Sequence, residues 1–411
     1  MRLLVILAAV VAALPSVGSE HFEVGAASVS ISPEDGAYLA GYGRDRTSLG
    51  VADELYAKAV VVRSRATDAQ LVLLTLDNIG LTRPDVLLVR AAIAQRLAMP
   101  ASHVIVSSTH THAGPDVVGL WGPSLWRSGR NPGYMSWLQD QAVAAAAQAY
   151  AKAQPARLIA ASAAVRLPWV ENRSEPDLID PMMTTLQFVA EDGRAVVTLT
   201  SFACHPTVLD DQNRYVSADY VGGYYAAMAQ QIEGEHLFLQ GAIGGWVQPL
   251  ASVGGFDVAQ RFGAELALAS RTLLQDHGEL IDEAGVVLNS AEFDIPLANW
   301  GFRLAMLLQV LPRDTVDGAL RTEAAWFRIG SVEFVTHPGE TSPAYSFASR
   351  RLMKAKHTIV MGLTQDALGY ILKPDYFADD APYPHAAYLR SVSVGEQAGP
   401  LLMETLTSLV P

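Results

Sequence analysis

A run of apolar residues that ends in two histidines is the feature that most limits how this chain can fold. Residues 104–116 read VIVSSTHTHAGPD, so the apolar letters VIV lead through small polar residues to His110 and His112. A Gly-Pro pair then turns the chain. A buried strand followed by paired imidazoles fixes two nitrogen ligands at the end of a rigid element. The rest of the fold has to supply the groups that meet these histidines.

Two further apolar runs end in polar residues in the same way. The run at 195–204 ends at His205, and a predicted hairpin across Gly330 ends in a segment that contains Glu340. Side chains at the ends of different strands can converge at one edge of a sheet, so we expect His110, His205 and Glu340 to lie close together. Two imidazoles and one carboxylate form a three-ligand zinc set with the fourth position open.

Other interpretations of these residues stay open on spacing alone. A single histidine beside a strand is more often a hydrogen-bonded structural residue than a ligand. Glu340 precedes a predicted helix and could be only an N-terminal charge. Because residues i and i+2 of a strand share a face, His112 either binds the same metal as His110 or acts on the substrate.

The order of strands and helices predicts an α/β fold, with a layered mixed sheet or sheets and helices packed outside. Runs rich in β-branched and aliphatic residues predict strands at 22–31, 56–63, 70–76, 158–165, 183–190, 195–204, 285–295, 326–329, 332–336 and 357–361. Apolar residues at helical spacing predict helices at 82–97, 135–154, 220–232, 256–274 and 343–354. The sequence does not determine the strand order.

The amino-terminus is typical of a signal peptide. Arg2 precedes an apolar run from Leu3 to Leu14, which is too short to span a bilayer, and Pro15 and small residues follow. We therefore predict a signal peptide at 1–19 and a single domain at 20–411. The mature protein is expected to be secreted or periplasmic and to contain no transmembrane segment.

The charge of the chain excludes one class of partner. The sequence has 42 Asp and Glu against 29 Lys and Arg, a formal net charge of −13, without basic clusters. Nucleic-acid binding requires Lys and Arg to neutralise phosphates, so we expect no nucleic-acid partner. A lipid substrate would have to be captured by apolar contact, and contact with a membrane surface would be at most transient.

The stretch SSTHTHAGPD resembles the Thr-His-Thr-His-Ser/Ala-Gly-Pro signature of the neutral ceramidase family, the neutral/alkaline non-lysosomal type. Other segments resemble that family in the same order along the chain: GAASVSISP followed by GYG, GVADELYAKAVVV, ENRS, SFACHPT, PGET and ALGYILKPDYF. The resemblance covers most of the mature chain. It implies a neutral-ceramidase-like catalytic domain with a zinc site at strand ends.

The resemblance also implies a metal-ligand set. The zinc ligands of the family fall on His110, His205, Glu340 and Tyr370 of this sequence. The cofactor implied is therefore Zn2+. Spacing alone does not point to the tyrosine.

Three further residues match substrate-side positions of the family. His112 matches the second histidine of the signature, which faces the substrate. Arg173 matches the arginine of the Asn-Arg-Ser loop and is expected to hold a substrate oxygen or stabilise negative charge. Tyr383 matches a further substrate-side tyrosine. These three residues are the predicted catalytic set.

The sequence departs from the family in two places. The family's Gly-Asp-Val-Ser-Pro loop, whose serine has been proposed as a nucleophile, aligns with residues 245–249, where Gln248 replaces the serine. A glutamine cannot act as that nucleophile, so attack by zinc-activated water is the expected route. In addition, we expect no counterpart of the family's immunoglobulin-like C-terminal domain within these residues.

The function predicted from this resemblance is that of an exported zinc-dependent hydrolase. It would cleave a linear amide, that of ceramide or a related N-acyl lipid, with zinc-activated water. One alternative keeps the fold and the metal but changes the substrate to an ester, a polyamide or a small acylated molecule. A second alternative is a non-catalytic binding protein.

Overall fold

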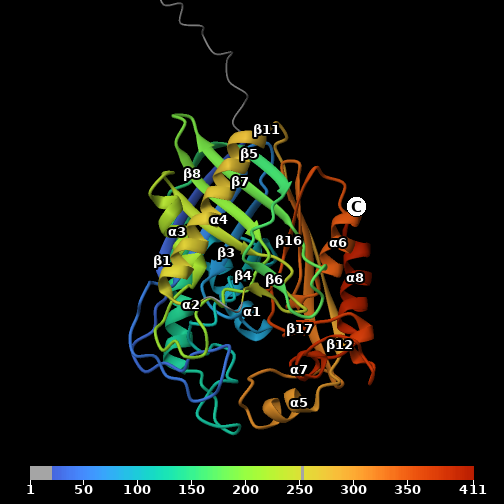
Figure 1. Cartoon of the computed structure of the whole chain (residues 1–411). Coiled ribbons are helices and arrows are strands. Elements are labelled where there is room, and N and C mark those ends of the chain that lie inside the picture. Colours follow the sequence, from blue (N-terminus) through green and yellow to red (C-terminus); the bar gives the residue numbers. More distant parts are fainter. Residues whose placement is uncertain (1–20, 251–253) are drawn as a thin grey trace, which may run out of the picture.

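The structure, a computed structural model, describes residues 21–250 and 254–411 (Figure 1). Within them the chain forms four layers, with helices outside two sheets that face each other. This arrangement confirms the predicted α/β fold with layered sheets and outer helices. The predicted signal peptide lies outside the described residues and stays a prediction.

The larger sheet follows the strand order β4-β3-β2-β1-β5-β7-β8-β9, with β11 paired to β5. Its strands are β1 (Phe22–Ser30), β2 (Tyr56–Ser64), β3 (Gln70–Leu76), β4 (Val104–Ser108), β5 (Gln154–Ala164), β7 (Met182–Ala190), β8 (Ala195–Phe202), β9 (Glu235–Gln240) and β11 (Glu279–Ile281). All pairs are antiparallel except β3–β4 and β8–β9, at the two ends of the path.

The segments that follow β4 and β8, from opposite parts of this sheet, are both hydrogen-bonded to the end of β9. The side chain of Gln240, at the end of β9, donates hydrogen bonds to the backbone carbonyls of Thr109 and Cys204 at 3.0 and 2.9 Å. These carbonyls directly precede His110 and His205. One buried amide therefore ties together the two segments that carry the predicted histidine ligands.

The smaller sheet has the order β12-β13-β14-β16, and β14 and β16 are parallel. Its strands are β12 (Val286–Pro296), β13 (Ala319–Ile329), β14 (Val332–Thr336) and β16 (His357–Met361). Two short pairs complete the strands: β6 (Val170–Asn172) with β10 (Val247–Pro249), and β15 (Glu340–Thr341) with β17 (Tyr370–Ile371). Buried residues from both large sheets, including Phe188, Leu199, Phe327 and Phe334, form one apolar cluster between them.

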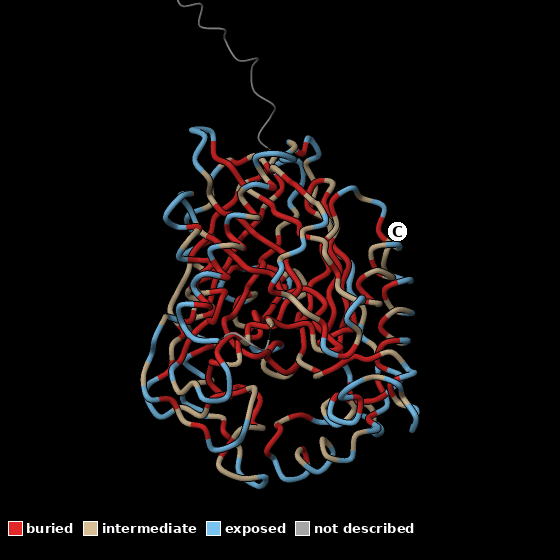
Figure 2. The backbone as a smooth tube through the Cα atoms, viewed as in Figure 1, coloured by how far each residue is buried: buried red, intermediate tan, exposed pale blue. Residues whose placement is uncertain are grey.

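Helices cover the outer faces of both sheets. The larger sheet is covered by α1 (Arg83–Leu97), α2 (Pro132–Ala151), α3 (Tyr220–Ala229) and α4 (Phe256–His277), and the smaller one by α6 (Pro343–Leu352) and α8 (Ala398–Leu409). Buried backbone fills the middle of the molecule (Figure 2). In the part of the chain that the structure describes, no helix has the length and apolar character needed to cross a membrane.

Three helices were not predicted: α5 (Trp300–Leu307), α7 (Ala386–Ser391) and α8. Both α5 and α7 lie at the end of the molecule where the short pair β15–β17 is found (Figure 1). The predicted helix at 220–232 ends earlier, at Ala229. The strand predicted at 326–329 is the longer β13, which begins at Ala319, and the other predicted helices and strands are present with ends shifted by a few residues.

Candidate metal centre

The ends of three different sheet strands bring His110, His205 and Glu340 together. His110 follows β4 with a left-handed backbone (φ 72°), and its N–H donates to the carbonyl of Asn78 at 2.8 Å. A non-glycine residue in this region is strained, so the surrounding contacts must hold it there. Glu340 begins β15 and pairs directly with Tyr370 of β17. The backbone thus sets the positions of these groups before their side chains interact.

The distances between the ring nitrogens and the carboxylate are close to the edge length of a coordination tetrahedron. Glu340 Oε2 lies 2.9 Å from His205 Nε2 and 3.5 Å from His110 Nε2. His110 Nε2 lies 3.3 Å from His112 Nε2. Ligand atoms about 2.0–2.1 Å from a tetrahedral zinc ion are about 3.3–3.4 Å from each other. The residues present therefore fit a small divalent cation, and ring nitrogens of all three histidines lie within 4.8 Å of one another.

The second ring nitrogens distinguish the three histidines. His110 Nδ1 donates to the carbonyl of Ile79 at 2.5 Å, and His205 Nδ1 donates to the carbonyl of Val247 at 2.6 Å. In each of these two histidines the hydrogen bond from Nδ1 fixes the tautomer, so Nε2 carries the lone pair that can bind a metal, as in most metal-binding histidines. Buried His112 Nδ1 has no hydrogen-bond partner among the described residues. Its tautomer is therefore not fixed, which suits a histidine that moves a proton rather than only holding a metal.

Glu340 and Tyr370 form the acidic side of the cluster. Burial alone would raise the pKa of the Glu340 carboxyl, but His110 and His205 outweigh it and hold that pKa well below its usual range. The Tyr370 hydroxyl is hydrogen-bonded to Glu340, and burial followed by the Glu340 charge raises the pKa of Tyr370. A buried carboxylate that faces ring nitrogens is stabilised by positive charge. A cation bound between these groups would supply that charge.

His112 is held in place by the glycine-rich segment that follows β1. Gly41 has a φ of +95°, and a Cβ on it would lie 2.4 Å from the His112 ring. The ring of Tyr42 lies 5.2 Å from that of His112, and Arg46 Nη2 donates to the carbonyl of His112 at 2.9 Å. Burial, and then the neighbouring histidines, lower the pKa of His112 well below its usual value. His112 is therefore neutral at physiological pH.

Arg173 lies at the edge of the site, in contact with the aromatic ring of Trp246. It is exposed, and its guanidinium lies 5.2 Å from the ring centroid of Trp246. Trp246 in turn lies 5.3 Å from the ring of Tyr388. Burial, followed by the charge of Glu340, raises the pKa of Tyr388, which is close enough to sense the acidic side of the cluster. Sequence reasoning did not select Tyr388.

Tyr383, which the sequence resemblance predicts as a catalytic residue, does not contact the metal-binding side chains in the described structure. Its hydroxyl donates to Asp375, and its ring stacks on that of Tyr376 at 4.0 Å between centroids. The described contacts of Tyr383 thus lie with its own chain segment rather than with the histidines. Both tyrosines belong to a tyrosine-rich stretch, and no pattern in the sequence distinguishes them.

Gln248, which the sequence resemblance aligns with the family's serine, is hydrogen-bonded to a carboxylate of the neighbouring strand. It lies on β10, opposite Glu171 of β6, and its Nε2 donates to Glu171 Oε1 at 3.2 Å. The residue before it, Val247, accepts hydrogen bonds from both the backbone N–H and Nδ1 of His205. The loop therefore supports His205 through its backbone.

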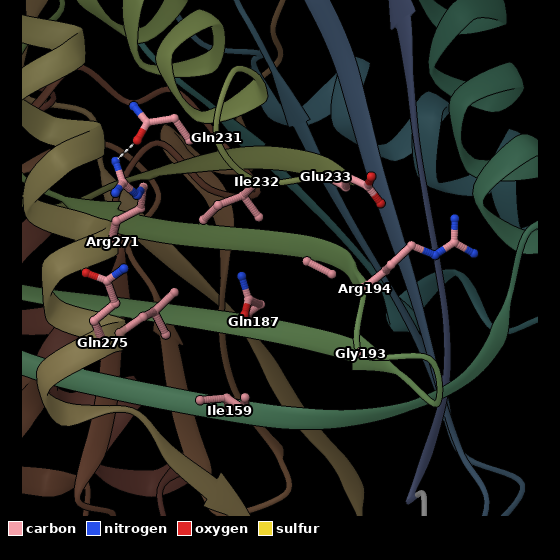
Figure 3. A pocket seen from close by; sticks show the side chains of 11 residues that line it. Ile159, Gln187, Gly193, Arg194, Gln231, Ile232, Glu233, Arg271 and Gln275 are labelled. Carbon is pink, nitrogen blue, oxygen red and sulfur yellow. Dashed lines mark hydrogen bonds between the residues drawn. The ribbon is translucent and has the colours of Figure 1, made fainter. Parts of the chain in front are cut away.

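A surface hollow of ≈ 560 Å³ lies at the opposite end of the larger sheet (Figure 3). It includes the turn between β7 and β8 around Gly193, whereas His205 follows the other end of β8. Arg271 donates a hydrogen bond to Gln231 at one side of it (Figure 3). Its lining includes no metal-binding histidine.

Comparison with known proteins identifies the same family as the sequence resemblance. Residues 22–251, more than half of the chain, match the family model "Neutral/alkaline non-lysosomal ceramidase, N-terminal". Over 193 residues the chain is 26% identical to the neutral ceramidase of Pseudomonas aeruginosa, a stretch that spans 43% of this chain and 29% of that protein.

Two solved structures share the fold. The crystal structure of the Pseudomonas aeruginosa neutral ceramidase superposes with a TM-score of 0.74 at 17% identity, over 95% of this chain and 75% of that one. A ceramidase complexed with C2 gives a TM-score of 0.77 at 17% identity, with the same coverage. At this level of identity the structural likeness shows a common architecture.

Proposed function

Because the chain belongs to the neutral/alkaline non-lysosomal ceramidase family, we propose that it hydrolyses the amide bond of an N-acyl lipid such as ceramide, with zinc as cofactor. The observation that carries this proposal is the convergence of His110, His205 and Glu340, with Glu340 Oε2 3.5 and 2.9 Å from the Nε2 atoms of the two histidines. A zinc ion bound there would lower the pKa of a water molecule to about 7 and polarise the substrate carbonyl.

The residues around that centre would have different roles. His110, His205, Glu340 and Tyr370 would hold the metal. His112 is neutral and half-buried, and its Nδ1 is without a partner among the described residues, so it can accept a proton and pass it to the leaving nitrogen.

The groups at the rim would act on the substrate rather than on the metal. The positive charge of Arg173 would hold a substrate oxygen or stabilise the negative charge that develops there. We propose Tyr388 in place of Tyr383 as the tyrosine that donates to the substrate, because Tyr388 lies near Glu340 and Trp246.

A substrate screen with metal analysis tests the proposal. We expect the purified full chain to contain about one zinc ion per molecule and to release fatty acid from ceramide or short N-acyl amides. Removal of zinc with a chelator should abolish the activity, and added zinc should restore it. An active protein free of metal would contradict the proposal.

The same screen should include p-nitrophenyl esters, because Gln248 stands where the family has a serine and the substrate class of this chain can differ. Turnover of esters without turnover of amides would favour an esterase on the same centre. Bound zinc with no turnover of either class would favour a binding protein.

The Gln248→Ala variant tests whether this loop supplies a reacting group. Gln248 makes one hydrogen bond to Glu171, and the net worth of such a bond is about 0.5–1.5 kcal/mol. We therefore expect kcat to change by less than about tenfold. A loss of several orders of magnitude, with folding and zinc content intact, would show that the loop takes a direct part in the chemistry.

A further inference from the structure

Large apolar side chains are exposed beside the candidate metal centre. We use the term apolar rim for six of them: Leu125, Trp126, Trp300, Leu304, Leu307 and Leu308. Trp300 and Leu307 are 76% and 78% exposed, and Trp126 is 62% exposed. Single exposed apolar residues are ordinary, but a group of them marks a surface that meets another apolar phase.

The apolar rim is built by α5 and the segments around it. Asn299 caps this helix by accepting a hydrogen bond from the N–H of Phe302. Met306 is the residue of α5 that is buried. Trp300, Leu304 and Leu307 follow one another at i, i+4 and i+7, so they share one helix face, which points to solvent.

The rim adjoins the candidate site through several contacts. Phe302 of α5 packs over Gly369, the residue before Tyr370. The side chain of Asn299 donates to the carbonyls of Ser391 and Ser393, at the end of α7, which carries Tyr388. α5 and α7 lie at the same end of the molecule (Figure 1). Material that contacts the rim is therefore close to the segments that carry Tyr370 and Tyr388.

The two parts of the rim also lie side by side. A Cβ on Gly119 would lie 2.0 Å from the carbonyl oxygen of Val310, so these two backbones touch. Gly119 belongs to the segment that carries Leu125 and Trp126, and Val310 follows α5 directly. The contact places the exposed residues of both segments at one end of the molecule.

The charges of the two segments that carry the rim differ from those of the whole chain. Segments 117–131 and 299–313 contain no Asp or Glu, in a sequence that has 42 of these residues. Each segment contains two arginines, and one of each pair, Arg127 and Arg303, is exposed. Exposed apolar groups, tryptophans and arginines without carboxylates are typical of surfaces that lie in the headgroup region of a bilayer.

We propose that the apolar rim docks on the surface of a phospholipid bilayer and brings the candidate site to a lipid substrate held in that bilayer. Trp126 and Trp300 would sit at the level of the headgroups, with Leu304 and Leu307 below them. Arg127 would face lipid phosphates. The docking follows from the rim itself, whereas the delivery of substrate rests on the proposed function.

Vesicle binding by the full chain tests the proposal. Wild-type protein should float with phosphatidylcholine vesicles and show a blue shift of tryptophan fluorescence. The double variant Trp300→Ser/Leu307→Ser should bind at least about tenfold more weakly, because each side chain would lose its apolar burial. Leu268→Ser, at a 56% exposed site on α4, is the matched control and should bind as wild type does.

Activity measurements separate docking from chemistry. The double variant should lose hydrolysis of a vesicle-embedded substrate and keep that of a water-soluble short-chain amide. If the wild type hydrolyses neither substrate but still binds vesicles through the rim, the proposed function fails and the docking stands. Equal vesicle binding by wild type and double variant would overturn the docking. A wild-type dimer that the double variant dissociates, without vesicle binding, would instead identify a protein interface and also overturn it.

Discussion

Replacement of His110 by alanine is expected to remove both the bound zinc and the activity. His110 Nε2 lies 3.5 Å from Glu340 Oε2, and His110 is one of the two histidines proposed to hold the metal. Loss of the metal would remove several kcal/mol of transition-state stabilisation, so kcat/KM should fall at least about 10³-fold. Elemental analysis and turnover of a short N-acyl amide measure the two effects.

The matched control is His277→Ala, at an exposed histidine at the end of α4. This variant should keep wild-type zinc content and turnover. Circular dichroism should show that His110→Ala remains folded, since both large sheets are held by apolar contacts elsewhere. A folded His110→Ala protein with full zinc content would remove His110 from the ligand set. The His112→Ala variant, which should keep most of its zinc, tests the different role proposed for that residue.

Replacement of Asp366 by alanine is expected to cause a large loss of stability. Asp366 is buried and accepts two hydrogen bonds from Arg313, at 2.5 and 2.7 Å, and one from Thr322 at 2.8 Å. Its removal would leave the buried guanidinium of Arg313 unpaired, which costs about 3–5 kcal/mol of unfolding free energy. Urea unfolding followed by fluorescence measures this loss.

The control for this variant is Asp294→Ala. Asp294 also forms a bidentate pair, with Arg321, but both side chains are more than 40% exposed. Exposed pairs of this kind contribute about 0–1 kcal/mol, so this variant should lose far less stability. Equal losses in the two variants would show that burial of the Arg313 pair does not determine its contribution.

Most of the sheet strands could be predicted because their residues leave little choice. Runs such as Val104–Ser108 and His357–Met361 combine β-branched and apolar residues and are bounded by turn residues. Polar residues at the ends of predicted strands indicate a site at His110, His205 and Glu340, and the structure brings these three residues together. Strand order was not predictable, because it depends on contacts between distant segments such as those of Gln240.

The missed elements have identifiable physical reasons. α8 begins with Ala398, Gly399 and Pro400, residues that usually mark a turn. Proline is tolerated in the first turn of a helix, where its missing N–H would be unpaired in any case. α5 is short and turns apolar residues outward, so its pattern does not match that of a core-facing helix. Tyr388 was missed because its proximity to Glu340 arises only from the placement of α7.

The support of His205 by the carbonyl of Val247 has a consequence for how such a chain can change. A backbone carbonyl is present whatever side chains the loop carries, so the side chain at position 248 can change while His205 keeps both of its hydrogen bonds. Substitutions in this loop can therefore leave the metal ligands where they are. The fold separates the part of the centre that must stay fixed from the part that is free to diverge.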